Sequence, residues 1–477
     1  MRTFESMAQG ALKARTLEKR ITLAQEAVEY ALYHATGYYA SPKLEHIYLE
    51  AASTIPEVAC HPQKGTVLHV MTKAYASGGH TRVVQRWIEL SKEKELHSIV
   101  LLKQDDEAIP EWLNEAAQKH GGALITFKDA DDIAIANKLR QLASTYERIV
   151  LHVHPNDPVA LIAFGTESFT TPIIYFNHAD HLFWLGVSIA DMVADMRYDH
   201  FSYIRRDVHQ SYVLGIPCAP FVDNRVADKS AIRRELGIPE NGQIIVTTGS
   251  AFKYRPLGNN CLSKQLVEIV RRNEKVSCYA IGPSMSLSEW KWANEVTNGK
   301  IHPLGVITNK DIYRKYLQAA DMYMCSYPYG GYTSMMDAVQ CGLPFLQLVM
   351  TRQQKSMLCL RPDIDQTKCL CYSTKELVNR TLAVLKDKKE YADLLASSIE
   401  WANDYVDQAR WQERLYAMYS ACSPRHAIHL FECQRGKQVY VDDEHCLMQL
   451  MYAMDDMEPR NKILRHIAHG WMRMKGV

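Results

Sequence analysis

Hydrophobic positions change their spacing twice along this chain of 477 residues. Apolar residues recur at helical spacing near the N-terminus, for example over residues 17–32. From Thr66 onward, short apolar runs alternate with amphipathic segments. After Thr374 the helical spacing returns, and one long amphipathic stretch carries both Trp401 and Trp411. The pattern predicts a central α/β region with helical additions at both ends.

The short apolar runs of the central region form two series. Each run is nearly continuous in apolar residues, which is typical of strands in a parallel sheet that is covered on both faces. The segment between the series, residues 220–241, is rich in Pro, Asp and Asn, as a linker is. The sequence therefore predicts two Rossmann-like, doubly wound domains whose strand C-termini face a cleft. The predicted strands are 67–71, 97–102, 123–127, 148–153, 172–176 and 192–196 in the first series, and 243–248, 276–280, 301–304, 321–326, 344–349 and 369–372 in the second.

The chain length fits this division. Domains typically contain about 100–200 residues, so a chain of this length is expected to form two to four domains. We expect a helical N-terminal segment over 1–62, one Rossmann-like domain over 63–218, a second over 219–400 and a helical C-terminal segment over 401–477.

Charge and hydropathy narrow the class of protein. The 55 basic and 54 acidic residues give a formal net charge of +1, so no global field attracts nucleic acid or an anionic membrane. The first residues lack an apolar signal region, and no run of about 18 apolar residues predicts a membrane-spanning helix. We therefore expect a cytoplasmic protein without a transmembrane segment.

The segment 327–344 carries the most chemical information. Two adjacent glycines form a turn that opens a helix with Tyr332, Thr333 and Ser334 in its first turn and Asp337 about one turn later. A helix N-terminus offers unpaired N–H groups and a positive dipole end, so a phosphate can bind there beside the two hydroxyls. Asp337 can accept hydrogen bonds from ribose hydroxyls, although it can also be a surface aspartate that aids only solubility. The segment predicts a nucleoside-diphosphate site.

Two strand ends of the second series supply further candidates. Gly249 follows the first strand, and Lys253 lies shortly after it, where its charge can neutralise a diphosphate leaving group. A solvated loop lysine is the alternative for Lys253, and Arg255 is the reserve cation. Gly282 ends the next strand, where backbone groups can contact the base or the sugar.

The first strand of the first series is followed by Gly78 and Gly79, which open a predicted helix containing Arg82. Two glycines at this point allow a tight turn and a close approach of the backbone to a ligand. A simple strand-to-helix turn explains them equally well. The dinucleotide-binding fingerprint is absent because the third glycine is missing.

Histidines follow two later strands of the first series. His178 and His181 come after the strand 172–176, and His154 ends the strand before it. Ligands bind at the carboxyl ends of strands in such sheets, so these imidazoles are candidates for a general base or for orienting an acceptor. A structural role is the alternative.

Taken together, these pieces resemble the GT-B glycosyltransferases. Gly78 and Gly79 with Arg82 look like the glycine loop of the acceptor-side domain, and the run 304–321 looks like the approach to the donor site. Many retaining members carry two glutamates eight residues apart on the donor helix. Here Asp337 stands at the second place, whereas the first place is Tyr329.

The donor helix itself is more similar to that of the protein O-GlcNAc transferase and its bacterial N-glucosyltransferase relatives. In this comparison Thr333 and Ser334 match the residues on the distal phosphate. Asp337 matches the ribose ligand, and Lys253 matches the lysine that stabilises the leaving UDP. The segment 63–218 then corresponds to the acceptor domain and 219–400 to the nucleotide-sugar donor domain.

The resemblance implies a metal-independent and inverting transfer of a sugar from a UDP-sugar, with the nucleotide sugar as co-substrate and no other cofactor. The acceptor is unidentified. A protein or a glycan is favoured, and the balanced charge disfavours nucleic acid as acceptor while leaving it open. The oligomeric state is also open. Two other classes of function compete with transfer: a sugar-nucleotide epimerase built on the same two-domain cleft, and a non-catalytic protein that binds nucleotide sugars.

Overall fold

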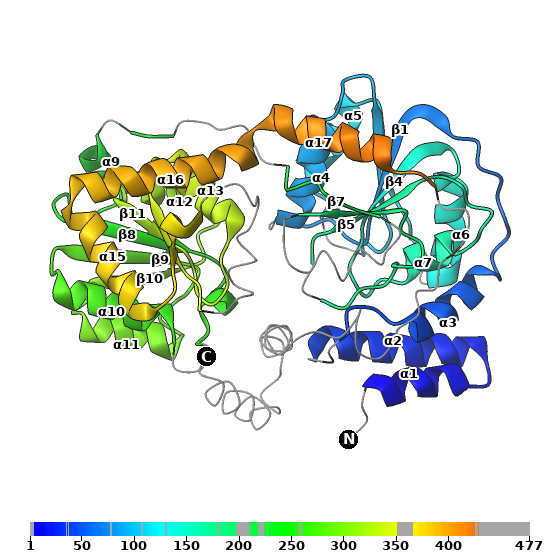
Figure 1. Ribbon diagram of the computed structural model, residues 1–477, viewed down its shortest axis with the longest axis horizontal. Helices are drawn as coiled ribbons and strands as arrows, with labels where there is room; N and C mark the ends of the chain where they lie inside the picture. The colour runs from blue at the N-terminus through cyan, green and yellow to red at the C-terminus, as the bar shows by residue number, and fades with distance from the viewer. Residues whose placement is uncertain are drawn as a thin grey trace. The chain divides into compact units, whose positions relative to one another are not determined.

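The computed structural model describes residues 4–34, 36, 38–76, 79–105, 108–128, 131–179, 182–196, 210–217, 224–226, 228–256, 260–350, 366–424 and 428. These residues form two compact units (Figure 1). The first unit contains the described residues up to 217 and those from 408 onward, and the second contains residues 224–407. The units are described separately below. Whether the four predicted segments are independent domains stays a prediction.

A seven-stranded parallel sheet forms the centre of the first unit, in the order β3-β2-β1-β4-β5-β6-β7. This order reverses between β1 and β4, and such a switch point opens a crevice at the carboxyl ends of the two strands. The strands are β1 (Gln63–Met71), β2 (Leu96–Leu101), β3 (Leu124–Thr126), β4 (Tyr146–His152), β5 (Ile173–Asn177), β6 (Met192–Asp195) and β7 (Ser211–Val213). The helices are α1 (Phe4–Lys13), α2 (Leu17–Tyr33), α3 (Pro42–Ala52), α4 (Gly79–Glu89), α5 (Glu111–Lys119), α6 (Asp132–Ala143), α7 (Val159–Phe164) and α17 (Gln408–Ala421).

The N-terminal helices α1, α2 and α3 belong to the core of the first unit, where they pack together beside α7 (Figure 1). Tyr48 of α3 and Phe164 of α7 are both fully buried in the same cluster. Glu45 is also buried, and its carboxylate accepts hydrogen bonds from the N–H groups of Gly186, Val187 and Ser188 at 2.9, 3.0 and 2.9 Å. Burial raises the pKa of Glu45, whereas these bonds lower it. The carboxylate thereby ties α3 to the loop before β6.

A six-stranded parallel sheet forms the centre of the second unit, in the order β10-β9-β8-β11-β12-β13. Its switch point lies between β8 and β11. Together the two sheets confirm the prediction of two Rossmann-like domains. The strands are β8 (Gln243–Thr248), β9 (Val276–Ile281), β10 (Ile301–Gly305), β11 (Met322–Met324), β12 (Phe345–Leu348) and β13 (Leu370–Cys371). The helices are α9 (Lys229–Glu235), η1 (Ala251–Tyr254), α10 (Leu262–Arg272), α11 (Ser288–Val296), α12 (Lys310–Ala319), α13 (Tyr332–Gln340), η2 (Gln366–Cys369), α15 (Thr374–Lys386) and α16 (Lys388–Val406).

The amphipathic stretch that carries Trp401 and Trp411 consists of two helices rather than one. Helix α16 ends at Val406, and Asp407 takes an extended conformation, with φ −73° and ψ 96°. Trp401 packs against Phe345 of the second unit, with ring centroids 4.9 Å apart. Trp411 lies fully buried in the first unit, on α17. The two tryptophans fill different cores, and the apolar spacing alone does not show the break at Asp407.

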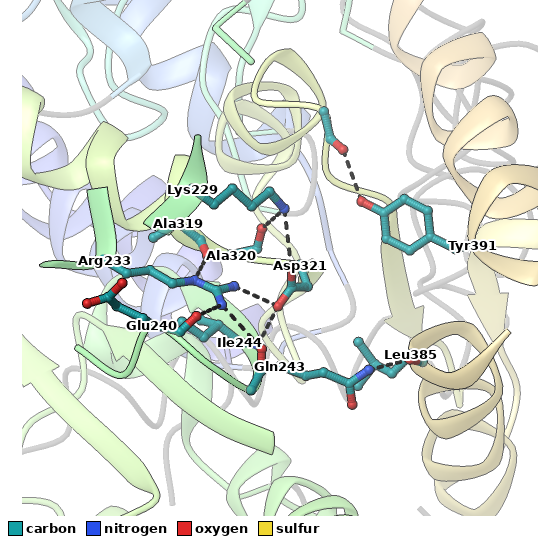
Figure 2. Close-up of polar contacts among 12 residues, drawn as sticks. Lys229, Arg233, Glu240, Gln243, Ile244, Ala319, Ala320, Asp321, Leu385 and Tyr391 are labelled. Carbon is teal, nitrogen blue, oxygen red and sulfur yellow. Dashed lines mark hydrogen bonds and ion pairs between the residues drawn. The ribbon is translucent and has the colours of Figure 1, made fainter. Parts of the chain in front are cut away.

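Asp321 anchors the start of β11, the short strand that leads to the predicted donor segment. Its carboxylate is 2.8 Å from Nη2 of Arg233 and 3.3 Å from Nζ of Lys229, both on α9 (Figure 2). The N–H of Ile244 on β8 donates to the same carboxylate at 2.8 Å. Arg233 is nearly buried, so loss of the Asp321 carboxylate would leave a largely buried guanidinium group without its ion-pair partner. The network fixes β11 beside β8.

The helices in the described ranges include none that is long and apolar enough to cross a bilayer. The cellular compartment stays a prediction.

Candidate functional site

The predicted diphosphate site lies at the carboxyl edge of the second sheet, where the loops after β8 and β11 are neighbours. The loop after β11 ends at Gly331, which is the N-cap residue of α13. Glycine has no side chain to accept from the first N–H groups of the helix. The N-terminus of α13 therefore presents backbone donors and a positive dipole end to a ligand.

Lys253 reaches this helix start from the loop after β8. Its Nζ donates to the carbonyl oxygen of Gly330 at 3.4 Å. A Cβ placed on Gly331 would lie 3.4 Å from the same Nζ. Burial lowers the pKa of Lys253, and no carboxylate of the described residues forms an ion pair with it. A cation placed in this way is available to an anion at the start of α13.

A second polar group joins three elements around Asp337. The hydroxyl of Tyr313, on α12, donates to Oδ2 of Asp337 at 3.2 Å. The side chains of Thr248 and Ser334 also lie near this hydroxyl. Burial raises the pKa of Tyr313 far above its usual value, and the charge of Asp337 adds to the effect. Asp337 and Ser334 therefore lie on the side of α13 that faces the end of β8.

The glycines after β8 and β9 allow these loops to approach each other. Gly282 has φ +114°, in the region that side chains rarely adopt, and a Cβ there would lie 1.7 Å from the carbonyl oxygen of Gly249. A Cβ on Gly249 would lie 3.3 Å from Cδ of Lys253 and from Oγ of Ser326. Gly282 therefore requires a residue without a side chain, whereas a Cβ at Gly249 would need its neighbouring side chains to shift by a few tenths of an ångström.

Substituting Gly282 by alanine should destabilise the protein strongly. The methyl group would overlap a backbone carbonyl, and overpacking alone costs roughly 1–3 kcal/mol. Gly299→Ala is the matched control, because Gly299 also has positive φ, +79°, but nothing within 4 Å of the added Cβ. Denaturant unfolding should give a much larger loss for Gly282→Ala than for the control. Equal losses would mean that the loops move apart at little cost.

The remaining predicted donor residues lie on the same elements. Thr333 is exposed in the first turn of α13. Tyr332 begins α13, and its side chain is outside the described part of the structure. Arg255 is half-buried and directly follows η1, close in sequence to Lys253. Tyr313 and Thr248 were missed as site residues, because only the fold brings α12 and the end of β8 to Asp337.

The first sheet gathers histidines at its own carboxyl edge. His178 follows β5, and its ring centroid lies 4.3 Å from that of His80 in the first turn of α4. His154 follows β4, and its Nε2 is 3.2 Å from the hydroxyl of Tyr75. Burial lowers the pKa of both His80 and His154. His80 was missed, because in sequence it reads as part of a glycine turn.

Two predicted residues of this region, Gly78 and His181, lie outside the described residues. Gly79 begins α4, and a Cβ placed there would meet nothing within 4 Å. Packing within the protein does not explain a glycine at 79, so its role toward a ligand stays a prediction.

Over the described ranges, no group of three or more His, Cys, Asp or Glu side chains is arranged to hold a metal ion. Metal-free binding of the nucleotide stays a prediction.

No protein-family model matches this chain, and a search of curated proteins also finds no match. Solved structures do match. A mutant O-GlcNAc transferase of Thermobaculum terrenum gives a TM-score of 0.55 at 12% identity, over 88% of this chain and 84% of its own. HepE of Anabaena, in complex with UDP and glucose, gives a TM-score of 0.54 at 13% identity, over 75% of this chain and 99% of its own. A glycosyltransferase of Rickettsia africae gives a TM-score of 0.54 at 11% identity, over 75% of this chain and 98% of its own.

The matched structures are GT-B glycosyltransferases, and at these low identities the likeness establishes the fold. The chain has the two-domain GT-B fold, and the predicted resemblance is confirmed.

Proposed function

We propose that this protein is a glycosyltransferase that moves a sugar from a nucleoside diphosphate, most simply UDP, to an acceptor. The observation that carries the proposal is Lys253. It is a lysine within hydrogen-bond distance of the Gly330 carbonyl, beside the N-terminus of α13, with no carboxylate partner in the described residues. The fold adds support, since HepE of the same fold was solved with UDP and glucose.

The donor would be bound by the groups around α13. The helix N-terminus and the hydroxyls of Thr333 and Ser334 suit the diphosphate. Asp337 would accept from the ribose hydroxyls, in the place where it now accepts from Tyr313. Gly249 and Gly282 would let the ligand approach the backbone at the ends of β8 and β9.

In the transfer step, the bond between the sugar carbon and the UDP oxygen breaks, and its electron pair stays on the diphosphate. Lys253 and the N-terminus of α13 stabilise the charge that grows there. The acceptor oxygen bonds to the same carbon from the opposite face, so the configuration inverts. A histidine of the first unit, His178 or His181, accepts the acceptor proton. This mechanism uses no metal and no cofactor beyond the nucleotide sugar.

The acceptor that fits this proposal is a protein or a glycan. The net charge of +1 provides no broad basic surface for nucleic acid. We propose a cytoplasmic location and leave the oligomeric state open.

UDP should bind without added metal. All proposed phosphate partners are hydroxyls, backbone N–H groups and one cation, none of which needs a bridging ion. Isothermal calorimetry with UDP in EDTA should therefore show the same affinity as calorimetry with Mg²⁺. Binding that disappears in EDTA and returns with Mg²⁺ or Mn²⁺ would contradict the metal-free site.

The products formed from UDP-sugars separate transfer from the competing functions. A glycosylated acceptor supports the proposal. An epimerised UDP-sugar identifies an epimerase, and unchanged UDP-sugar that nevertheless binds identifies a binding protein. A panel of UDP-sugars with peptide and glycan acceptors, analysed by mass spectrometry, provides this test.

A further inference from the structure

Three histidines form a continuous hydrogen-bonded chain inside the first unit. Nδ1 of His97, on β2, is 3.0 Å from Nε2 of His69, on β1. Nδ1 of His69 is 3.1 Å from Nε2 of His152, on β4. All three side chains are completely buried. The donor-site mechanism uses none of them.

The strand register places the three rings on one face of the sheet. His97 pairs with Val67 and His152 pairs with Met71, two positions on either side of His69 along β1. Because alternate residues of a strand face the same side, the rings form a diagonal row. The row runs from the beginning of β2 to the carboxyl end of β4, beside the switch point of the sheet.

Glu95 lies at the β2 end of the row. Its Oε2 accepts a hydrogen bond from the hydroxyl of Tyr416 at 2.6 Å. The same oxygen is 3.6 Å from Nε2 of His97, just beyond hydrogen-bond distance, and this nitrogen has no hydrogen-bond partner among the described residues. Burial raises the pKa of Glu95, but the nearby His97 ring and the hydrogen bond from Tyr416 outweigh burial and hold the pKa below its usual value. An ionised carboxylate is negatively charged and only accepts hydrogen bonds, so we assign the proton of His97 to Nε2, the nitrogen that faces Glu95.

That end fixes the direction of the whole row. A neutral imidazole has one N–H and one acceptor nitrogen. Burial lowers the pKa of His69 and His152 well below the usual value, so both rings are neutral. With a single proton on His97, placed at Nε2, Nδ1 of His97 accepts from Nε2 of His69, and Nδ1 of His69 accepts from Nε2 of His152. Nδ1 of His152 is left as an unprotonated acceptor.

The open end of the row lies toward the histidines of the carboxyl edge. Nδ1 of His152 and Nε2 of His80 are both buried without a hydrogen-bond partner in the described part of the chain. The ring centroids of His152 and His80 are 6.5 Å apart, and that of His178 lies 4.3 Å beyond His80. Nδ1 of His152 is therefore close to the edge of the sheet where we expect the base that takes the proton from the sugar acceptor.

We propose that His152, His69, His97 and Glu95 form a proton relay that removes the acceptor proton from the carboxyl edge of the first sheet. The relay rests on the proposed glycosyl transfer. As the acceptor oxygen bonds to the sugar, its O–H bond breaks and the proton passes through the edge histidines to Nδ1 of His152. Nε2–H of His152 moves to Nδ1 of His69, Nε2–H of His69 moves to Nδ1 of His97, and Nε2–H of His97 moves to Glu95. Each imidazole ends neutral in its other tautomer, and Glu95 ends as a carboxylic acid.

The resting direction of the row can be measured without any activity. Nitrogen-15 NMR of the histidine-labelled full chain, with each signal assigned by substitution, should show Nε2–H tautomers for His69, His97 and His152 at neutral pH. An imidazolium at His97 or an Nδ1–H tautomer at His152 would overturn the relay, because the open end could then accept no proton.

Two substitutions test the transport of the proton. Glu95→Gln keeps an oxygen acceptor beside His97 and Tyr416 but removes the group that takes the proton. His69→Phe keeps an aromatic ring and breaks the row. Each should lower turnover by about 10²-fold, at the lower end of the range for general acid–base catalysis, with unchanged UDP affinity. His120→Gln is the control, because His120 packs edge-on against His97 at 5.5 Å without joining the row. It should keep normal turnover.

The outcomes separate the relay from the proposed function. Normal turnover in a folded Glu95→Gln protein overturns the relay and leaves sugar transfer intact. If His69→Phe does not fold, Glu95→Gln and the NMR tautomers decide. A wild-type protein that transfers no sugar from any UDP-sugar overturns the proposed function and the catalytic role of the relay together.

Discussion

Lys253→Ala should lower turnover with a UDP-sugar about 10²–10³-fold, the usual cost of removing one group that stabilises charge in the transition state. The charge on the diphosphate grows as the glycosyl bond breaks, so Lys253 contributes more to the transition state than to the bound donor. UDP-sugar affinity should therefore change less than turnover. Steady-state kinetics and calorimetry on the same preparations measure the two effects. Lys291→Ala, which removes an exposed lysine of α11, is the control.

The pH dependence gives this prediction a second readout. A lysine carries its charge below its pKa, and burial lowers the pKa of Lys253 from the usual 10.5. For the free enzyme, kcat/KM should therefore decline on the alkaline side at a pH below 10.5. Lys253→Arg should move this decline to higher pH, because arginine stays charged. Near-normal turnover in Lys253→Ala would show that Lys253 does not stabilise the leaving diphosphate.

Asp337→Ala should act mainly on donor affinity. Ribose hydrogen bonds are equally strong in the ground state and the transition state, so they lower KM without assisting the chemical step. A hydrogen bond to a charged group contributes roughly 1.5–3 kcal/mol, which corresponds to a roughly 10- to 150-fold increase in the dissociation constant. The saturated rate should stay close to normal. Titration of the folded variant with UDP measures the change.

A control is available on the neighbouring helix. Asp311→Ala removes an exposed carboxylate from the first turn of α12 and should leave UDP affinity unchanged. If Asp337→Ala behaves like Asp311→Ala, then Asp337 is a helix-surface aspartate and the donor-site assignment is wrong. Tyr313, which now donates to Asp337, would then have only a structural role.

Local patterns were sufficient for the fold and for part of the donor site. Continuous apolar runs identified the strands, because a parallel sheet covered on both faces needs apolar residues on both sides of each strand. The glycine turn before α13 was equally local, and it located Ser334 and Asp337. Tyr313 was not found as their neighbour, because its contact with Asp337 depends on how α12 packs beside α13.

The histidine row shows a second limit of sequence patterns. In sequence, His69, His97 and His152 are single polar residues in three apolar runs. Their hydrogen bonds depend on the order β2-β1-β4 and on the register that sets His97 two positions before His69 and His152 two positions after it. A shift of one residue in either pairing would turn a ring to the other face of the sheet. No spacing along the chain encodes that register.

Helix α17 follows the second unit in the sequence but packs in the first unit, and this order has a consequence for biosynthesis. Trp87 donates its indole N–H to the hydroxyl of Tyr419 at 2.9 Å and packs edge-on against Trp411. Its burial therefore needs a helix that the ribosome makes after residues 224–407 of the second unit. Chains emerge N-terminus first, and an incomplete domain exposes apolar surface to aggregation. The second unit can therefore finish folding before the first. We therefore expect the unfinished first unit to bind a chaperone during synthesis more readily than the second unit does.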